Sequence, residues 1–220
     1  MAALVTTPYD TFLPEVLPYA ANCPEVVALN AIRNAVIEFC EDTWFWQHDC
    51  TPITGELNVG EYTPDVPANT HLAGVINAWY DGKPLYPQDN ASLRRRFPYS
   101  DYRDAQGSPA FWQHEDPDTM IIVPKPDVSS TGFLLTLRIA VSPLRASTDC
   151  NEQIYEHFAE LVAKGALARL KSTNGQPYSD PAGAVMLDRL FKAEIVKVRA
   201  DVERSLTRGP LRVRFNGRNG

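Results

Sequence analysis

The sequence predicts an α+β protein: a helical bundle of one N-terminal helix plus two long C-terminal helices, with an inserted antiparallel β region and a C-terminal extended tail. Two observations support this class. Apolar residues recur at spacings of three and four near both ends of the chain, which is typical of amphipathic helices. Residues 47–146 hold eleven of the eighteen prolines and several short alternating runs, which is typical of strands and loops. The expected segments are 1–46 (arm and first helix), 47–146 (inserted β-rich region), 147–208 (helical hairpin in the same bundle as 24–46) and 209–220 (tail).

The first segment is expected to be an extended arm followed by one amphipathic helix. Prolines punctuate residues 8–24 and leave room for a single helical turn at Phe12–Leu17. Pro24 suits the first position of a helix, and the periodic positions that follow are Leu29, Ile32, Val36, Phe39 or Cys40, and Thr43. This helix should span about twenty residues and end at the aromatic run 44–46. At least one tryptophan in that run, and the one in Trp79-Tyr80, are expected in the core.

The inserted region is expected to form an antiparallel sheet. Its predicted strands, in chain order, are Ile53–Tyr62, His71–Tyr80, Lys83–Tyr86, Thr119–Pro124 and Gly132–Val141. Asp81-Gly82 joins two of them and is the strongest short-range signal for a hairpin. Residues 89–97 predict a short helix with an Asp or Asn cap, and residues 98–110 predict a polar loop.

The C-terminal third is expected to form a helical hairpin. In Asn151–Leu170 the apolar face is Ile154, Phe158, Leu161 and Val162, and another face carries Glu152, Glu156 and Glu160. Small residues at 165–168 would allow a second helix to approach closely. Residues 173–177 break the first helix, and Asp180-Pro181 begins a second one. Its apolar positions step by three or four from Leu187 to about Thr207, and Gly209-Pro210 ends it.

The composition is that of an ordinary globular protein. The chain has 220 residues, of which 44% are hydrophobic and 22% charged, so it is long enough for a core and does not resemble a disordered chain. No apolar run approaches the ~18 residues of a membrane-spanning helix. The first residues lack the basic start of a signal peptide. We therefore expect a soluble intracellular protein with no membrane partner.

The charge of the chain is divided unevenly. The total is −6, which mildly disfavours a protein that coats nucleic acid by bulk attraction. Residues 189–220 carry nine basic side chains against three acidic ones, or +6, so residues 1–188 carry −12. This division favours a partner-binding tail, and a solvated basic helix face is the alternative.

The residue types that carry catalysis or bind metals do not form a known motif. The four cysteines include no C-x-x-C pair, and the four histidines are scattered. Cys40, His48 and Cys50 could converge, but buried free thiols are the better interpretation. Nucleophile, phosphate-binding and dinucleotide-binding motifs are absent from the sequence. The acidic pairs Glu41-Asp42 and Glu115-Asp116 are interpreted as solvated helix ends and loops, His157 as a surface or interface residue, and His71 as a residue that nothing nearby in sequence activates. We predict no catalytic residue, cofactor or metal.

A basic cluster, Arg94, Arg95 and Arg96, lies close to Phe97, Tyr99 and Tyr102. Arginines on phosphates and tyrosines on bases would bind nucleic acid. Asp101 and Asp104 dilute this charge, so the cluster is a possible subunit or DNA contact, and an intersubunit salt bridge or a solvated helix is favoured.

The order of the elements and several local runs resemble one family. The runs are Cys23-Pro24; Ala31, Ala35, Glu38-Phe39-Cys40, Thr43 and Trp46; Ala78–Leu85; Ile121–Pro124 with Pro126; Ala140–Pro143; Gly165–Ala168 with Leu170; and Pro177–Pro181. Together they cover residues 14–209 and resemble the head-to-tail adaptor (connector) proteins of tailed bacteriophages. That group includes the tubular tail proteins that lie under the portal.

This resemblance implies a structural virion protein of the neck or tail, not an enzyme, assembled in the host cytoplasm. It implies a homo-oligomeric ring, a dodecamer, docked beneath the portal protein, with genome DNA passing through its lumen without sequence-specific binding. The far face would receive the next tail component: a nozzle, tail tube or tail terminator. The C-terminal segment would reach into the portal, and the residues expected to bind there are Arg208, Leu211, Arg212, Val213, Arg214 and Phe215.

The charge division suggests how such a ring would treat DNA and portal. The acidic body would line or rim the channel and repel DNA, while the basic tail holds the portal. Two functions of other classes stay open. One is a nucleic-acid-binding protein that uses Arg94–Arg96 and the basic C-terminal helix. The other is an enzyme whose site is assembled from distant residues.

Overall fold

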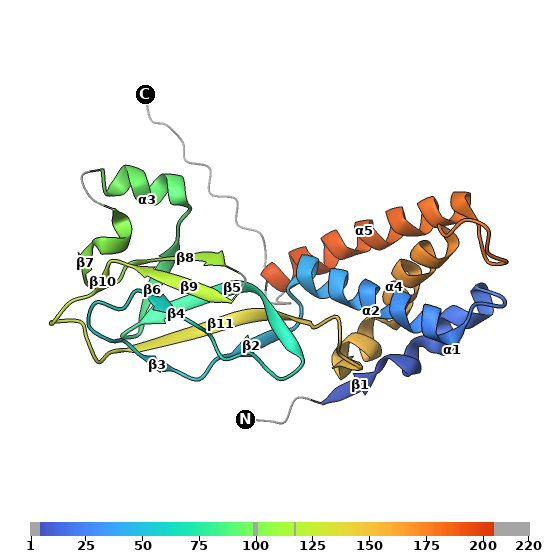
Figure 1. The fold of residues 1–220 in the computed structure, drawn as a ribbon, viewed down its shortest axis with the longest axis horizontal. Coiled ribbons are helices and arrows are strands. Elements are labelled where there is room, and N and C mark those ends of the chain that lie inside the picture. Colours follow the sequence, from blue (N-terminus) through green and yellow to red (C-terminus); the bar gives the residue numbers. More distant parts are fainter. Residues whose placement is uncertain (1–4, 99–100, 117, 205–220) are drawn as a thin grey trace, which may run out of the picture.

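The protein is elongated, with helices gathered at one end and strands at the other (Figure 1). A computed structural model describes residues 5–98, 101–116 and 118–204. The expected tail 209–220, and the end of the last helix near Thr207, lie outside these residues. The mixed α+β class predicted from the sequence is confirmed.

The helices lie at both ends of the chain, with one short helix between them. They are α1 (Leu13–Val16) between 3₁₀ turns at Tyr9–Phe12 and Leu17–Tyr19, α2 (Glu25–Thr43), α3 (Asn90–Arg96) followed by a 3₁₀ turn at Tyr102–Asp104, α4 (Glu152–Lys171) and α5 (Pro181–Glu203). The helices α2, α4 and α5 contact one another, and α1 contacts α4. Within the described residues, none of these helices is both long enough and apolar enough to cross a membrane.

The strands form one large mixed sheet and two small ones. They are β1 (Thr6–Pro8), β2 (Gln47–Asp49), β3 (Ile53–Thr54), β4 (Glu61–Tyr62), β5 (Thr70–Tyr80), β6 (Lys83–Pro87), β7 (Gln106–Gly107), β8 (Phe111–Asp116), β9 (Thr119–Val123), β10 (Lys125–Pro126), β11 (Leu134–Pro143) and β12 (Asp149–Asn151). The large sheet has the order β2-β11-β5-β6-β8-β9-β4, with β3 also on β11. The pairs β1–β12 and β7–β10 stand apart from it.

The first long helix agrees with the sequence prediction except at its start. α2 begins at Glu25, and Pro24 precedes it in an extended conformation (φ −61°, ψ 135°) rather than occupying the first helical position. The helix ends where Trp44 adopts a left-handed conformation (φ 55°) and donates its N–H to the Cys40 carbonyl at 3.0 Å. This turn directs the following residues out of the helical body.

The β region confirms the predicted hairpin, but it is not antiparallel throughout as expected, because β6 pairs with β8 and β7 with β10 in parallel. Asp81 and Gly82 both have positive φ (52° and 68°), as a two-residue hairpin turn requires. The expected strand Ile53–Tyr62 is wrong as a single element. Only its two ends are strands, β3 on β11 and β4 on β9, because the chain turns between them at Asn58 (φ 63°).

The expected extended arm 8–24 is wrong over residues 9–19, which form 3₁₀ and α turns rather than one turn at Phe12–Leu17. Several strands were not predicted from the sequence. They include β1, which pairs with β12, β2, which pairs with β11, and β7 in the expected loop 98–110, which pairs with β10. β8 was missed because its Trp-Gln-His-Glu run lacks apolar alternation; it lies between β6 and β9. The short helix was correct, since α3 begins after Asp89, whose carboxylate accepts from the Ser92 N–H at 2.6 Å.

A close helix–helix contact holds α5 against α4. Gly165 faces Phe191, and a Cβ added at Gly165 would lie 2.8 Å from that ring. Phe191 is fully buried (0% exposed) and Ile195 nearly so (4%). The small residues predicted to admit a second helix therefore do so. Asp180 caps α5 by accepting from the Gly183 N–H at 3.0 Å.

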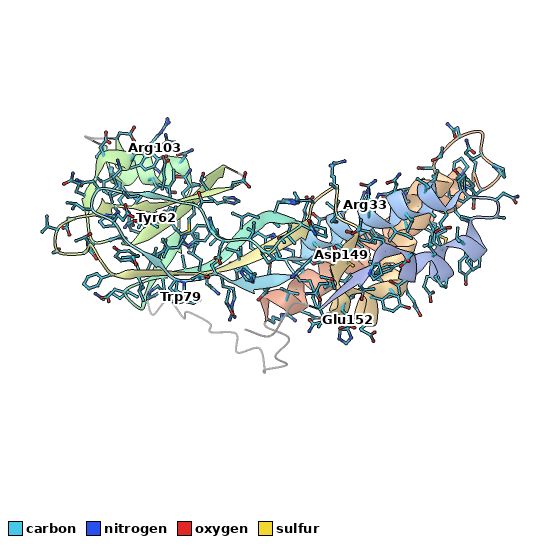
Figure 2. All side chains as sticks on the ribbon, turned by 60° about the horizontal axis from the view of Figure 1, so that its bottom comes forward. Arg33, Tyr62, Trp79, Arg103, Asp149 and Glu152 are labelled. Carbon is cyan, nitrogen blue, oxygen red and sulfur yellow. The ribbon has the colours of Figure 1, made fainter. Side chains whose placement is uncertain are left out.

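The core runs without interruption from the helices into the sheet. Trp46 is buried (3% exposed), as expected for the aromatic run. In the second aromatic pair the buried residue is Tyr80 rather than Trp79, which is half-buried. A second, smaller cluster lies under α3 and contains Leu93, Tyr102, Ile121 and Val123. Figure 2 shows side chains of both ends, with Glu152 in the helical body and Tyr62 in the β region.

Candidate docking surfaces

The outer face of α5 is apolar and basic. Opposite the buried Phe191 and Ile195, the helix exposes Val185, Met186 (64%), Leu190 and Val196 (67%) to solvent. The bases on the same side are Arg189 and Lys197. Neither base has a carboxylate within 4 Å in the part of the chain that is described, whereas the neighbouring Lys192 and Arg199 pair with Asp188 and Glu203. An outward helix face is normally polar, so this face has the composition of a contact surface.

The outer face of α4 is acidic. Glu152, Glu156 and Glu160 are exposed at intervals of four, and none forms an ion pair with a described residue. The helix is kinked at Phe158 (φ −134°, ψ 18°), between Glu156 and Glu160, but these two residues still line one groove. The acidic stripe predicted from the sequence is thus exposed and lacks an ion-pair partner among the described residues.

A groove runs beside this stripe, between α1, α4 and α5. One part of it has a volume of about 460 Å³. Its acidic lining residues are Glu15 and Glu160, and its apolar or aromatic ones are Tyr19, Ala163, Leu167 and Leu187. The bases in its wall are already paired: Lys164 with Glu194 at 2.9 Å and Lys171 with Asp180 at 3.4 Å. The groove therefore offers apolar contacts with unpaired carboxylates at its edge.

The basic cluster on α3 lies at the opposite end of the molecule from the α4–α5 loop (Figure 1). Arg94, Arg95 and Arg96 are exposed, but two of them have local partners. Arg95 donates to the Ala91 carbonyl (3.3 Å) and the Ser92 hydroxyl (3.2 Å), and Arg96 stacks over Phe111 at 4.4 Å. These contacts leave Arg94 as the member of the cluster with no local contact among the described residues.

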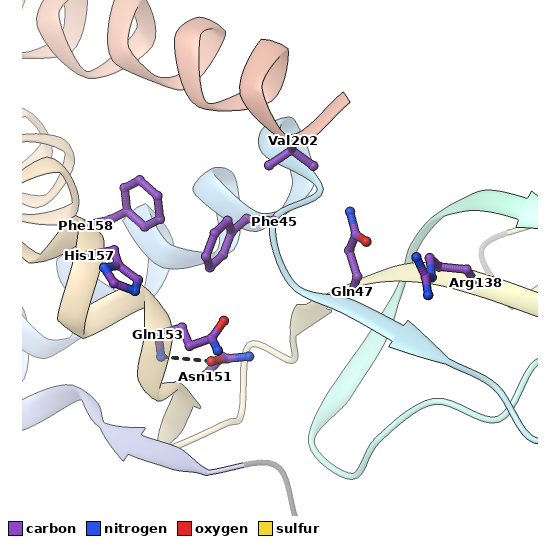
Figure 3. Close-up of a pocket in the computed structure, with 8 residues that line it drawn as sticks. All are labelled: Phe45, Gln47, Arg138, Asn151, Gln153, His157, Phe158 and Val202. Carbon is purple, nitrogen blue, oxygen red and sulfur yellow. Dashed lines mark hydrogen bonds between the residues drawn. The ribbon is translucent and has the colours of Figure 1, made fainter. Parts of the chain in front are cut away.

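A cleft of about 680 Å³ lies where the helices meet the sheet (Figure 3). It is lined by Phe45, Gln47, Arg138, Asn151, Gln153, His157, Phe158 and Val202. Arg138 is held by Asp49, with nitrogen–oxygen distances of 2.6 and 3.1 Å, and the hydrogen bond with Arg138 lowers the pKa of Asp49. The Asn151 side chain accepts from the Gln153 N–H at 2.9 Å and caps α4. The lining residues include no carboxylate that could work with His157 as an acid–base pair.

A group of possible metal ligands involves a residue that the sequence did not indicate. The ligand atoms of His48, Cys50 and Asp65 lie within 4.8 Å of one another, and Cys40 is not part of the group. Both Asp65 carboxylate oxygens already accept from Thr51, at 2.9 and 2.8 Å. Burial, followed by the charge of Asp65, raises the pKa of Cys50 to about 12, so its thiol is protonated at neutral pH. These contacts explain why the three residues lie close together: they are part of the loop structure.

His71 has a partner that is distant in sequence. Its Nε2 lies 3.3 Å from Glu41 Oε1 at the end of α2. Thirty residues separate the two, so no local pattern could reveal the pair. His71 is half-buried, and its contact joins β5 to α2 rather than lining either cleft.

The residues expected to bind the portal, Arg208, Leu211, Arg212, Val213, Arg214 and Phe215, lie outside the described residues. The described chain instead presents an apolar and basic helix face, an acidic stripe beside a groove, and a small basic cluster. Exposed apolar and charged surfaces of this kind are typical of a class of proteins that bind other macromolecules.

The comparison with protein families agrees with this class. The family model described as SU10 adaptor protein matches residues 7–214. The chain therefore belongs to the SU10 adaptor family, a family of bacteriophage adaptors. No curated protein matches the chain. Membership of a structural adaptor family favours a non-enzymatic role.

Proposed function

We propose that the protein is a head-to-tail adaptor: a structural virion protein that forms a ring between the portal and the tail, through which the genome passes. The observation that carries this proposal is the family match over residues 7–214, which includes the helical body, the β region and the first half of the C-terminal tail. The elongated shape supports it, because the two ends carry different elements and could contact different partners (Figure 1).

The proposal gives each segment a place. The helical body (1–46 with 147–208) would form the ring as one bundle, and the inserted region 47–146 would project from it. The tail 209–220 would reach the portal. Leu211, Val213 and Phe215 alternate with Arg212 and Arg214, so one side could add to a sheet edge while the other pairs with carboxylates.

The ring would be dodecameric, located in the virion neck or tail, and assembled in the host cytoplasm. A nozzle, tail tube or tail terminator would dock on its far face. The −12 charge on residues 1–188 would keep DNA from adhering to the channel.

Deletion of residues 209–220 tests the role of the tail. We expect binding to purified portal, measured by pull-down and interferometry, to fall by about tenfold or more. The matched control is Arg94→Ala/Arg95→Ala/Arg96→Ala, which also removes basic charge and should bind the portal normally. Undiminished binding of the deletion would contradict a portal-binding tail.

A nucleic-acid-binding function is the second candidate, because Arg94, Arg95 and Arg96 are exposed together on α3. Gel-shift assays with duplex DNA distinguish the two functions. Binding that weakens steeply with salt and disappears in the triple alanine variant would favour the second function. Absence of binding at about 100 mM salt would favour the adaptor.

A further inference from the structure

We infer that the outer face of α5 in one copy packs into the groove between α1 and α4 of a second copy. The inference rests on the proposed function, because it names the surfaces through which the ring would close. Both surfaces belong to the described chain. The contacts of each one indicate what its partner must carry.

The outer face of α5 is suited to an apolar partner with negative charge at its edge. Val185, Met186, Leu190 and Val196 lie on one side of the helix over about three turns. Single exposed apolar residues are ordinary on protein surfaces, but a contiguous set indicates an interaction site. Arg189 and Lys197 lie among them and have no carboxylate within 4 Å among residues 5–204.

The groove has the complementary chemistry. Its apolar contacts come from Tyr19 (66% exposed), Leu167 and Leu187, and its edge carries Glu15 and Glu160. The groove continues along α4 past Glu156, where a second part of about 590 Å³ is lined by Glu15, Glu156 and Glu160 and, at the edge that it shares with the outer α5 face, by Lys197. Lys164 and Lys171 are already paired within the chain, so three unpaired carboxylates face one unpaired base and the net unpaired charge of the groove is negative.

A contact between two copies would remove an unfavourable arrangement in each. The like charges of Glu156 and Glu160 line one groove, and cations from a neighbour would offset their repulsion. Arg189 and Lys197 would then gain the partners that they lack. Lys192 and Arg199, which also lie on α5, already pair with Asp188 and Glu203 and would only surround the contact.

The geometry of the two surfaces favours a closed assembly. The α5 face and the groove are different patches of the same chain that adjoin at Lys197, so each copy would use one patch on each neighbour. A contact of this heterologous kind builds a ring when its rotation closes. A two-fold dimer built on the α5 face alone would place Arg189 and Lys197 near their own copies.

Charge reversal in two separate variants tests the contact. The variants are Arg189→Glu/Lys197→Glu on the α5 face and Glu156→Lys/Glu160→Lys at the groove. Self-association is measured by sedimentation and native mass over a wide concentration range, alone and with purified portal. We expect each variant to associate at least about tenfold more weakly than the wild type. An equimolar mixture of the two should recover association. The reversed α5 face of one variant then meets the reversed groove of the other, and the native α5 face of the second meets the native groove of the first.

Two controls separate this contact from general effects of charge. Lys83→Glu/Arg145→Glu changes the net charge by the same amount as the α5 variant, at exposed positions outside α1, α4 and α5, and should associate like the wild type. All the substituted residues are exposed, so thermal unfolding should shift little.

The remaining outcomes overturn specific claims. If the wild type forms rings and both reversed variants do so equally well, the assigned contact is wrong while the adaptor function stands. If the variants lose association but their mixture does not recover it, the pairing of these two patches is wrong. If the wild type stays monomeric both alone and on the portal, the ring and the contact are wrong together.

Discussion

The helical body and the β region are stabilised in different ways. In the body, long helices interlock through close side-chain contacts, such as that of Phe191 on Gly165. In the β region, strands as short as two residues are joined by loops that side chains hold together. Tyr62 accepts from the Glu56 N–H at 3.2 Å and donates to the Val59 carbonyl at 3.0 Å, for example. The two regions share one core, but the β region adds side-chain hydrogen bonds that hold its loops.

The surfaces of the helical body and the β region also differ. Both regions expose apolar side chains, but the body gathers them on one face of α5 together with unpaired charges, whereas Val128 and Tyr86 of the β region lie on different segments. Asp and Ser side chains in the β-region loops bond to the backbone beside them. The body therefore combines a well-packed interior with a surface on which apolar and charged side chains lack partners. A ring-forming unit requires both properties, because its contacts must form without disturbing its own packing.

The largest expected effect is the loss of the interlock. Phe191→Ala should lower the free energy of unfolding by about 3–5 kcal/mol, because it empties a fully buried site beside Gly165. Met186→Ala, on the exposed side of the same helix, should change it by less than about 0.5 kcal/mol. Urea unfolding followed by far-ultraviolet circular dichroism measures both. Equal losses would mean that α5 does not pack as described.

An intermediate effect is expected from one hydroxyl of the β region. Tyr80→Phe should cost about 1–3 kcal/mol, because the buried hydroxyl donates to the Ser130 carbonyl at 2.6 Å and its loss leaves that acceptor without its bond. Burial also raises the pKa of Tyr80 to about 12, so the hydroxyl remains a donor at neutral pH. Tyr86→Phe, at an exposed site, is the control and should unfold like the wild type.

The smallest effect concerns acid sensitivity of a loop. Hydrogen bonds from Ser129 and then Ser130 hold the pKa of Asp127 below its ordinary value of 3.8. The stabilisation is present above that value and is lost as the pH falls through the lower pKa of the folded protein. The melting temperature should therefore drop less between pH 5 and pH 2.5 in Asp127→Asn than in the wild type. Identical drops would show that the loop makes no contribution to the pH dependence.

The sequence predicted what periodicity and turn chemistry determine. The inward faces of α2, α4 and α5, the Asp81-Gly82 hairpin and the cap at Asp180 follow from local spacing and were correct. β1 and β12 are three residues each and lie far apart in the chain, so no local pattern predicts their pairing. β8 lies between β6 and β9 but carries polar residues, so its sequence lacks the apolar alternation that predicts a strand.

The candidate surfaces were only partly visible in the sequence. The acidic stripe follows directly from Glu152, Glu156 and Glu160 at helical spacing. The apolar outer face of α5 was missed, because the stronger period through Phe191 and Ile195 had already marked the buried side. Met186 and Val196 acquire significance only when the structure shows that nothing in residues 5–204 covers them.

One further consequence follows from the pairing of β2 with β11. Within the described residues, the chain leaves the helical body once, through β2, and returns once, through the end of β11, and these segments are hydrogen-bonded neighbours. A force along the long axis of the molecule pulls both segments in the same direction (Figure 1). It does not slide one past the other, so the hydrogen bonds between them carry little load. The joint therefore acts as a doubled tether, whose strength under tension comes from two covalent strands that share the load.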